Sequence, residues 1–111
     1  MKTFDVRDKA RHSEKGEGLL GFRDTGSHAC YLIYGIVKPK EKGRSVKPGV
    51  GHEEIVLAMR GELEVTGFLS GTLKEGSAFL IEGEHECHLE NRGKEDAVFI
   101  IAGGHSVGSR H

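Results

Sequence analysis

The sequence has no tryptophan, only two prolines and two cysteines, and no apolar segment long enough to cross a membrane. Two cysteines, Cys30 and Cys87, are too few for a disulfide framework, so we expect both thiols to be free in a reducing compartment. No apolar run follows the basic residues near the N-terminus, so the sequence predicts no signal peptide. These absences together predict a soluble, cytoplasmic protein.

A strong charge of one sign is also lacking. The 16 basic and 17 acidic residues give a formal net charge of -1, which favours neither nucleic acid nor an anionic membrane as a partner. Without tryptophan, few aromatic side chains remain for stacking on bases. We therefore expect a small-molecule ligand, with no nucleic acid and no membrane among the partners.

Glycine, in contrast, is abundant: 17 of the 111 residues are glycines, which implies many tight turns. The length suits a single domain over residues 1–111, with a core at about 19–103 and an irregular N-terminal segment and C-terminal tail. No segment has a sustained helical period. Short apolar segments separated by turns favour an all-β sandwich or barrel.

Six segments carry the strand pattern. A short strand is also possible at residues 2–6, and residues 39–51 are expected to form a loop because they are rich in proline, glycine and lysine. The turn at residues 60–61 predicts that the segment after it forms a hairpin with the segment before it. The six expected strands are residues 29–38, 52–59, 62–68, 77–82, 85–91 and 97–104.

For two of these strands, the alternation of residues indicates which face points toward the core. Residues 52–59 become apolar on both faces after the first residues, so we expect both faces to be covered and Val56 to be fully buried. Along residues 85–91, one face carries His85, Cys87 and Leu89, and the other face is uniformly polar. The alternation therefore predicts that His85 and Cys87 point inward.

The spacing of two pairs of residues in the sequence is also informative. Glu54 is followed by six residues and Gly61, and Gly76 and Asn91 have the spacing of a second motif. Over about residues 30–102 the sequence resembles a small single-domain cupin of the RmlC-like superfamily. The resemblance implies a double-stranded β-helix (jelly-roll-like) barrel, a homodimer, and sugars, small organic acids or other polar metabolites as candidate ligands.

The cupin metal site, three histidines and one glutamate, does not transfer to this sequence. Counted from Glu54, the two histidine positions of the first motif hold Pro48 and Val50, and in the second motif Cys87 replaces the histidine. Only Glu54 is unchanged.

A rebuilt site is one alternative. His52 precedes Glu54 by two residues, and His85 precedes Cys87 by two, so by resemblance these four side chains could converge on a divalent transition metal, zinc or iron. The other alternative has no metal: Cys87 is then a small core residue, the histidines lie at the rim, and Glu54 pairs with a neighbour. A shift of one residue would instead bring His88 inward.

Three functions stay open at this point. The first is a cupin-like barrel protein that binds a small polar metabolite in its central pocket. The second is a metal-dependent enzyme of the oxygenase or isomerase type with the rebuilt His/Glu/Cys site, and the third is a structural or regulatory scaffold. The spacings of His28 and His105 specify no ligand. The basic residues of the 38–49 loop either form an anion-attracting rim at the barrel mouth or simply keep a loop solvated.

Overall fold

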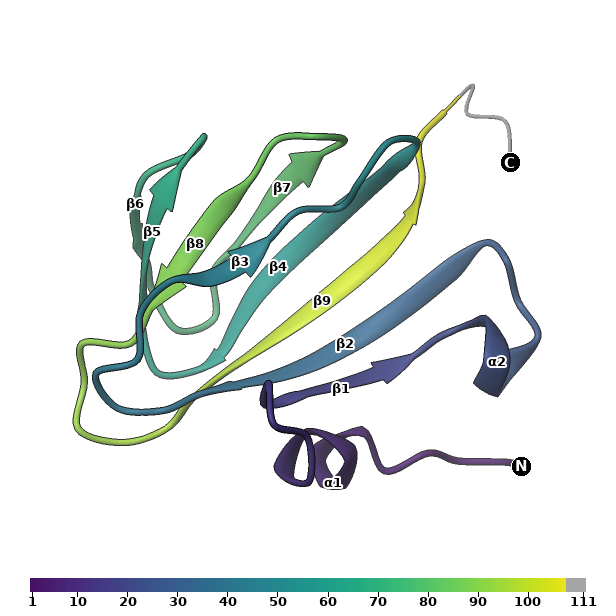
Figure 1. Cartoon of the computed structure of the whole chain (residues 1–111), viewed down its shortest axis with the longest axis horizontal. Coiled ribbons are helices and arrows are strands. Elements are labelled where there is room, and N and C mark those ends of the chain that lie inside the picture. The colour runs from purple at the N-terminus through teal and green to yellow at the C-terminus, as the bar shows by residue number, and fades with distance from the viewer. Residues whose placement is uncertain (108–111) are drawn as a thin grey trace.

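The protein was analysed as a computed structural model that describes residues 1–107. Two antiparallel β-sheets pack face to face (Figure 1). The first sheet has the strand order β1 (Glu17–Leu20), β2 (Cys30–Val37), β9 (Ala97–His105), β4 (His52–Arg60) and β7 (Ala78–Glu82). The second has the order β3 (Arg44–Val46), β8 (Cys87–Glu90), β5 (Leu63–Gly67) and β6 (Gly71–Leu73). None of the helices in residues 1–107 has the length and apolar character needed to span a membrane.

All six expected strands are present, and the all-β fold class is confirmed. Three further strands are present, and one of them, β1, lies at the end of the N-terminal segment that was expected to be irregular. The other two, β3 and β6, lie in segments that the sequence indicated as loop or turn. Each has three residues, which is too short for an alternating pattern to be visible in the sequence. Both are held by their neighbours, since β3 pairs with β8 and β6 pairs with β5.

The expected hairpin between residues 52–59 and 62–68 is wrong. β4 pairs with β9 and β7, whereas β5 pairs with β6 and β8 in the other sheet. The β4–β9 register shifts between Ala58 and Arg60, and Gly61 then takes a positive φ of 75°. A bulge bends its strand, and a left-handed glycine turns the chain sharply. Together they direct β5 into the second sheet.

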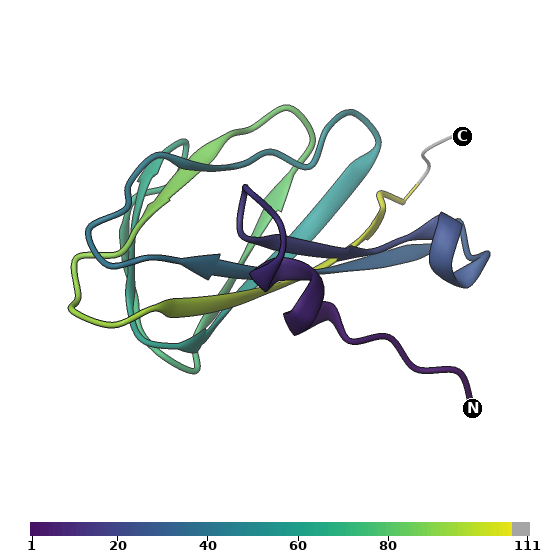
Figure 2. The same cartoon turned by 60° about the horizontal axis from the view of Figure 1, so that its bottom comes forward.

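The N-terminal segment is irregular only in part: residues 1–5 and 12–16 have no helix or strand, and residues 2–6 form no strand. Helix α1 (Val6–Arg11) begins after Asp5, whose carboxylate accepts a hydrogen bond from the Asp8 amide at 2.9 Å. Its Ala10 is buried against Tyr34 and Val98 on the outer face of the first sheet. A second short helix, α2 (Phe22–Thr25), connects β1 to β2. Figure 2 shows α1 lying against the β1–β2 side of the molecule. Six residues are too few to show a helical period in the sequence.

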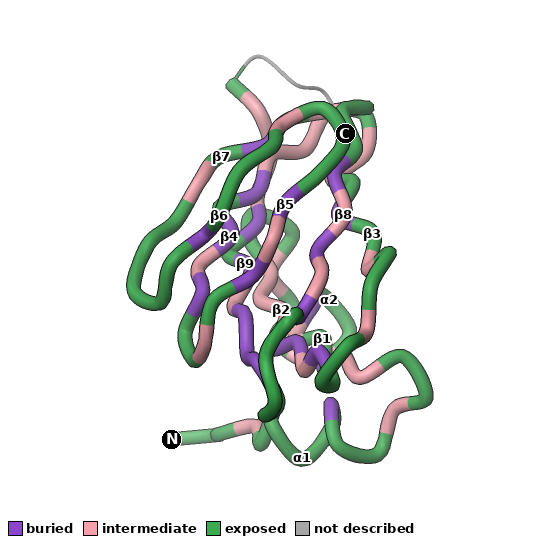
Figure 3. Tube along the Cα trace, turned by 90° about the vertical axis from the view of Figure 1, so that its left-hand side faces the viewer, coloured by how far each residue is buried: buried purple, intermediate pink, exposed green. Residues whose placement is uncertain are grey.

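The main core lies between the two sheets. Val56, Phe99 and Leu89 are fully buried there, which confirms the inward facing expected for Val56 and for the Leu89 side of β8. Gly35 allows the Phe99 ring to pack closely, because a Cβ at Gly35 would lie 2.1 Å from the ring. Buried segments follow the strands in Figure 3, and exposed segments follow the loops.

The outer face of β4 differs from the expectation that both of its faces are covered. Ile55 is 50% exposed and Met59 is 43% exposed. The reason is that α1 covers the outer face over β1, β2 and part of β9 but does not extend across β4 and β7. Within residues 1–107 this part of the sheet carries no covering element.

Candidate functional site

One row of residues across the first sheet contains the only charged side chain that is buried in the described part of the chain. Tyr31 on β2 pairs with Gly103 on β9, Gly103 pairs with Glu54 on β4, and Glu54 pairs with Ile81 on β7. Glu54 is 6% exposed. All four residues face the interior between the sheets, near the end where β4 begins and β9 ends.

The Tyr31 hydroxyl donates a hydrogen bond to Glu54 Oε2, and Tyr31 was not among the residues singled out in the sequence. Its ring lies over Gly103, where a Cβ would come within 2.1 Å of the ring. Glycine at that position is therefore what allows the phenol to reach Glu54. A buried tyrosine hydroxyl needs a polar partner, but nothing in the sequence indicates which residue that partner is.

Two histidines form the next pair of residues on the same face of the sheet, closer to its end. His52 and His105 are paired across β4 and β9, and their ring centroids are 5.0 Å apart. The ring centroids of His52 and Tyr31 are 6.1 Å apart. His52 Nδ1 lies 3.1 Å from the Val50 carbonyl oxygen, and because a carbonyl can only accept, Nδ1 carries the proton.

Burial raises the pKa of Glu54 above its usual value, since the charged carboxylate loses its hydration. The hydrogen bond from Tyr31 and the nearby His52 act in the opposite direction. The same burial, with the adjacent Glu54, raises the pKa of Tyr31 and keeps the phenol protonated as a donor. The pair can therefore both accept and donate hydrogen bonds in a site shielded from water.

Cys87 is fully buried, as the sequence predicted, and projects from β8 in the opposite sheet. Burial raises its pKa to about 11, and the negative charges of Glu54 and Glu86 add to the effect. At neutral pH the thiol is therefore protonated. Thiolates that react without a bound metal occur in the opposite, electropositive kind of surroundings.

His85 is not inside, contrary to the expectation from alternation. It precedes β8, is exposed, and stacks on the Phe68 ring with a centroid distance of 3.6 Å and an interplanar angle of 5°. The alternation failed because the strand begins only at Cys87, so His85 belongs to the turn. His88 is on the outward face of β8, with Nε2 3.4 Å from a Glu86 carboxylate oxygen. The register with His88 inward is therefore not adopted.

The four residues proposed from the sequence as metal ligands are only partly brought together. Glu54 and Cys87 face each other across the interior and His52 lies beside Glu54, but His85 is turned away. Within residues 1–107, no three His, Cys, Asp or Glu side chains are grouped so that they could hold a metal ion. As arranged here, the four side chains do not fit a common ion, and the metal site stays a prediction from the sequence.

The basic segment that follows β2 lies at the other end of the strands. Tyr31, at one end of β2, is in the Glu54 row, whereas Val37, at the other end, pairs with Ala97. Lys38 therefore begins the loop far from Glu54. Of the basic residues in this segment, only Lys47, which follows β3, lies near the beginning of β4, where its Nζ is 3.2 Å from a Glu84 carboxylate oxygen. The expectation of a basic rim around the barrel mouth is wrong.

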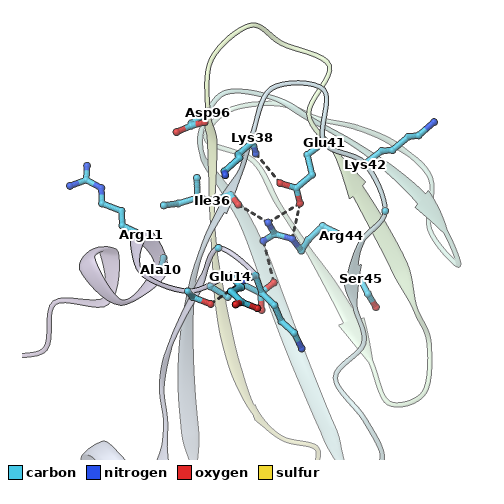
Figure 4. A pocket seen from close by; sticks show the side chains of 15 residues that line it. Ala10, Arg11, Glu14, Ile36, Lys38, Glu41, Lys42, Arg44, Ser45 and Asp96 are labelled. Atoms are coloured by element: carbon cyan, nitrogen blue, oxygen red, sulfur yellow. Dashed lines mark hydrogen bonds and ion pairs between the residues drawn. The ribbon is translucent and has the colours of Figure 1, made fainter.

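A cavity of about 660 Å³ lies beside that basic segment, outside the sandwich (Figure 4). Arg44 crosses it and is held by Glu41 at 2.8 Å, by Glu17 at 3.2 Å and by the Ile36 carbonyl at 2.7 Å. These contacts tie the loop to β1 and β2. In Figure 4 the Lys42 side chain points away from the other labelled residues, although Lys38, Lys42 and Arg44 of the segment all line the cavity.

Comparison with known proteins identifies the fold. No protein-family model and no curated protein matches the sequence. A protein with a double-stranded β-helix domain from Klebsiella pneumoniae superposes with a TM-score of 0.71 at 16% identity, covering 98% of this chain and 94% of that one. A predicted oxalate decarboxylase from Thermotoga maritima gives 0.66 at 17% identity, covering 81% of each chain. An RmlC-like cupin from Shewanella frigidimarina gives 0.62 at 14% identity, covering 83% of this chain and 77% of that one. The chain has the cupin fold.

Proposed function

We propose that this cupin-fold protein binds a small polar metabolite at the end of the sandwich where Glu54, Tyr31, His52 and His105 come together. One observation carries the proposal: a carboxylate is buried and hydrogen-bonded to a phenol at the edge of an otherwise apolar interior. Apart from Cys87, the rest of the main core cluster is aliphatic and aromatic.

The energetic argument supports a binding role. Burying a carboxylate and a hydroxyl costs free energy even when they are hydrogen-bonded, and apolar residues of similar volume often stabilise a protein when they replace such groups. Perturbed ionisable groups at the end of a barrel are typical of functional sites. We infer that the pair is kept for a ligand and not for stability.

The chemistry of the site restricts the ligand class. Glu54 and the Tyr31 oxygen can accept hydrogen bonds, since the single Tyr31 proton is already donated to Glu54, so ligand hydroxyl groups suit the site. The raised pKa of Glu54 also favours its protonated form next to a ligand carboxylate. Among the similar structures are the predicted oxalate decarboxylase and an oxalate oxidase with the substrate analogue glycolate. Small hydroxy acids and dicarboxylic acids, followed by sugars, are therefore the first compounds to screen.

The experiment is a thermal-shift screen of such compounds, with hits confirmed by titration calorimetry. A compound at about 100 times its Kd stabilises the native state by about 2.7 kcal/mol, which gives a measurable rise in Tm. Tyr31→Phe and Glu54→Gln should abolish the rise. Tyr34→Phe is the matched control, because Tyr34 is on the same strand but belongs to the cluster beneath α1. A rise that persists in both site variants would contradict the proposal.

The rebuilt metal site remains the second candidate, and it is separable by elemental analysis of protein prepared without a histidine tag or chelator. About one zinc or iron per chain, lost in Cys87→Ala, would support the metal-dependent enzyme. Because His85 is turned away from the other three residues, we expect far less than one metal per chain. A scaffold role predicts neither metal nor ligand.

We also propose a cytoplasmic location, in keeping with two free cysteines.

A further inference from the structure

The cavity beside the basic segment takes no part in the proposed site, which lies at the other end of the strands. Its volume of about 660 Å³ is within the range of about 300–1,000 Å³ that is typical of small-molecule sites. It lies between β1 and β3, which are edge strands of the two sheets, and residues from 10–17 and 41–45 supply most of its lining. We call it the edge cavity.

A guanidinium with little contact to solvent forms the floor of the edge cavity. The Arg44 side chain is only 11% exposed. Its Nε and Nη2 donate to Glu41 Oε2 at 3.1 and 2.8 Å, Nη2 also donates to the Ile36 carbonyl at 2.7 Å, and Nη1 donates to Glu17 Oε2 at 3.2 Å. A guanidinium has five N–H groups. One N–H of Arg44 Nη1 therefore has no partner within residues 1–107.

The two carboxylates that hold Arg44 differ in what they leave unused. Glu41 uses both oxygens, because its Oε1 accepts a hydrogen bond from the Lys38 amide at 3.0 Å. Glu17 uses only Oε2, and its Oε1 accepts no hydrogen bond from the described part of the chain. The Arg44–Glu17 ion pair therefore offers one donor beside one acceptor. An α-amino acid offers the complement, a carboxylate that accepts beside an ammonium that donates.

The other charges around the edge cavity are of both signs. Five basic and four acidic residues line it, so the lining has a net charge of only +1. Beyond the residues that hold Arg44, its unpaired cations include Lys15 and Lys38, and its unpaired acids are Glu14 and Asp96; none of these four forms an ion pair within residues 1–107. A lining of mixed sign favours neither a simple anion nor a simple cation, and it is complementary to a ligand that carries both charges.

We propose that the edge cavity binds a free α-amino acid, with the ligand carboxylate on Arg44 and the ligand ammonium on Glu17. Both contacts are charge-assisted hydrogen bonds, which are stronger than neutral ones. A mostly buried ion pair is by itself weak evidence for a role in stability, which leaves room for a role in binding. The remaining volume accommodates the side chain of the amino acid. This inference does not depend on the proposed metabolite site, which lies at the opposite end of the sandwich.

The first test is an NMR titration of the isotope-labelled wild type with the common α-amino acids, one at a time. At least one should shift the amide signals of Gly16 and Gly43, which line the edge cavity. The N-acetyl and carboxamide derivatives of that amino acid each lack one of the two charges, and each should bind at least about tenfold more weakly. No amino acid that shifts these signals, or a derivative that binds as well as its parent, would overturn the proposal.

The second test locates the site with Glu17→Gln. The amide oxygen can still accept from Arg44, but an NH2 group then takes the place of Oε1 and cannot accept from the ligand ammonium, so the Kd should rise at least about tenfold. Glu62→Gln, outside the edge cavity, is the matched control, and Tyr31→Phe should also bind as the wild type does. Thermal melts verify that each variant folds. Unchanged binding in a folded Glu17→Gln, or binding lost in Tyr31→Phe, would show that the amino acid binds elsewhere.

Discussion

Replacing Glu54 with glutamine tests the buried Tyr31–Glu54 pair most directly. The glutamine side chain has nearly the same size, and its amide oxygen can still accept the hydrogen bond from Tyr31. The substitution removes only the ability to ionise. Because burial raises the pKa of Glu54, we expect the variant to be more stable than the wild type at neutral pH.

The pH dependence gives the sign of the effect. Below the usual carboxyl pKa of 4.5, Glu54 is protonated in both the folded and the unfolded chain, and its contribution to stability is fully present. As the pH rises through the higher pKa of the folded state, the native carboxyl must ionise in a site that disfavours charge, and that contribution is lost. Each unit by which the pKa is raised corresponds to about 1.4 kcal/mol.

The assay is urea unfolding of the wild type and Glu54→Gln at several values between pH 4.5 and about pH 8. The free energy of unfolding of the variant minus that of the wild type should grow as the pH rises and then level off. Glu62→Gln, the same substitution at an exposed position, is the control and should show no such trend. A wild type that gains stability over the variant as the pH rises would mean that the ionised carboxylate is stabilised in the fold, and the reasoning would fail.

Three further outcomes follow from the packing. In native protein at mildly alkaline pH, a thiol reagent should modify the exposed Cys30 and not the buried Cys87, whose pKa is raised to about 11. Both thiols should react after unfolding. If both thiols react in the native protein, Cys87 is not buried as described. Gly103→Ala should cost about 1–3 kcal/mol in urea unfolding and displace Tyr31, because its Cβ would lie 2.1 Å from the ring, and a neutral result would mean that the ring is not held there. Val56→Asp should abolish cooperative melting by burying an unpaired charge, so a soluble variant with a sharp transition would refute the facing of β4.

The strands of the core could be located from local patterns because each spans enough residues for alternation to show. β2, β4 and β9 have eight or nine residues each, and the inward facing of Val56, Cys87 and Leu89 followed from period two alone. The spacings of Glu54 and Gly61 and of Gly76 and Asn91 also predicted the fold, by resemblance to cupins. Predictions from alternation were wrong at the ends of strands. At His85, for example, the two-residue period of the strand stops and a turn begins.

Pairing between strands depends on contacts between residues far apart in the sequence, and local patterns do not encode it. The hairpin expected between β4 and β5 was wrong because a bulge and a left-handed Gly61 moved β5 to the other sheet. Tyr31 and Glu54 are 23 residues apart, and they meet only because β9 lies between their strands with Gly103 at the crossing.

The sequence by itself therefore determined the class of fold, the strands of the core and the presence of an acidic residue where a cupin keeps one. Composition, turn chemistry and alternation are local properties, and they are sufficient for those conclusions. The tertiary structure alone decided that Glu54 faces a tyrosine, that His85 lies outside, and that Ile55 and Met59 on the outer face of β4 stay exposed within residues 1–107. Each of these depends on strand order and register, which are set by the packing of the whole chain.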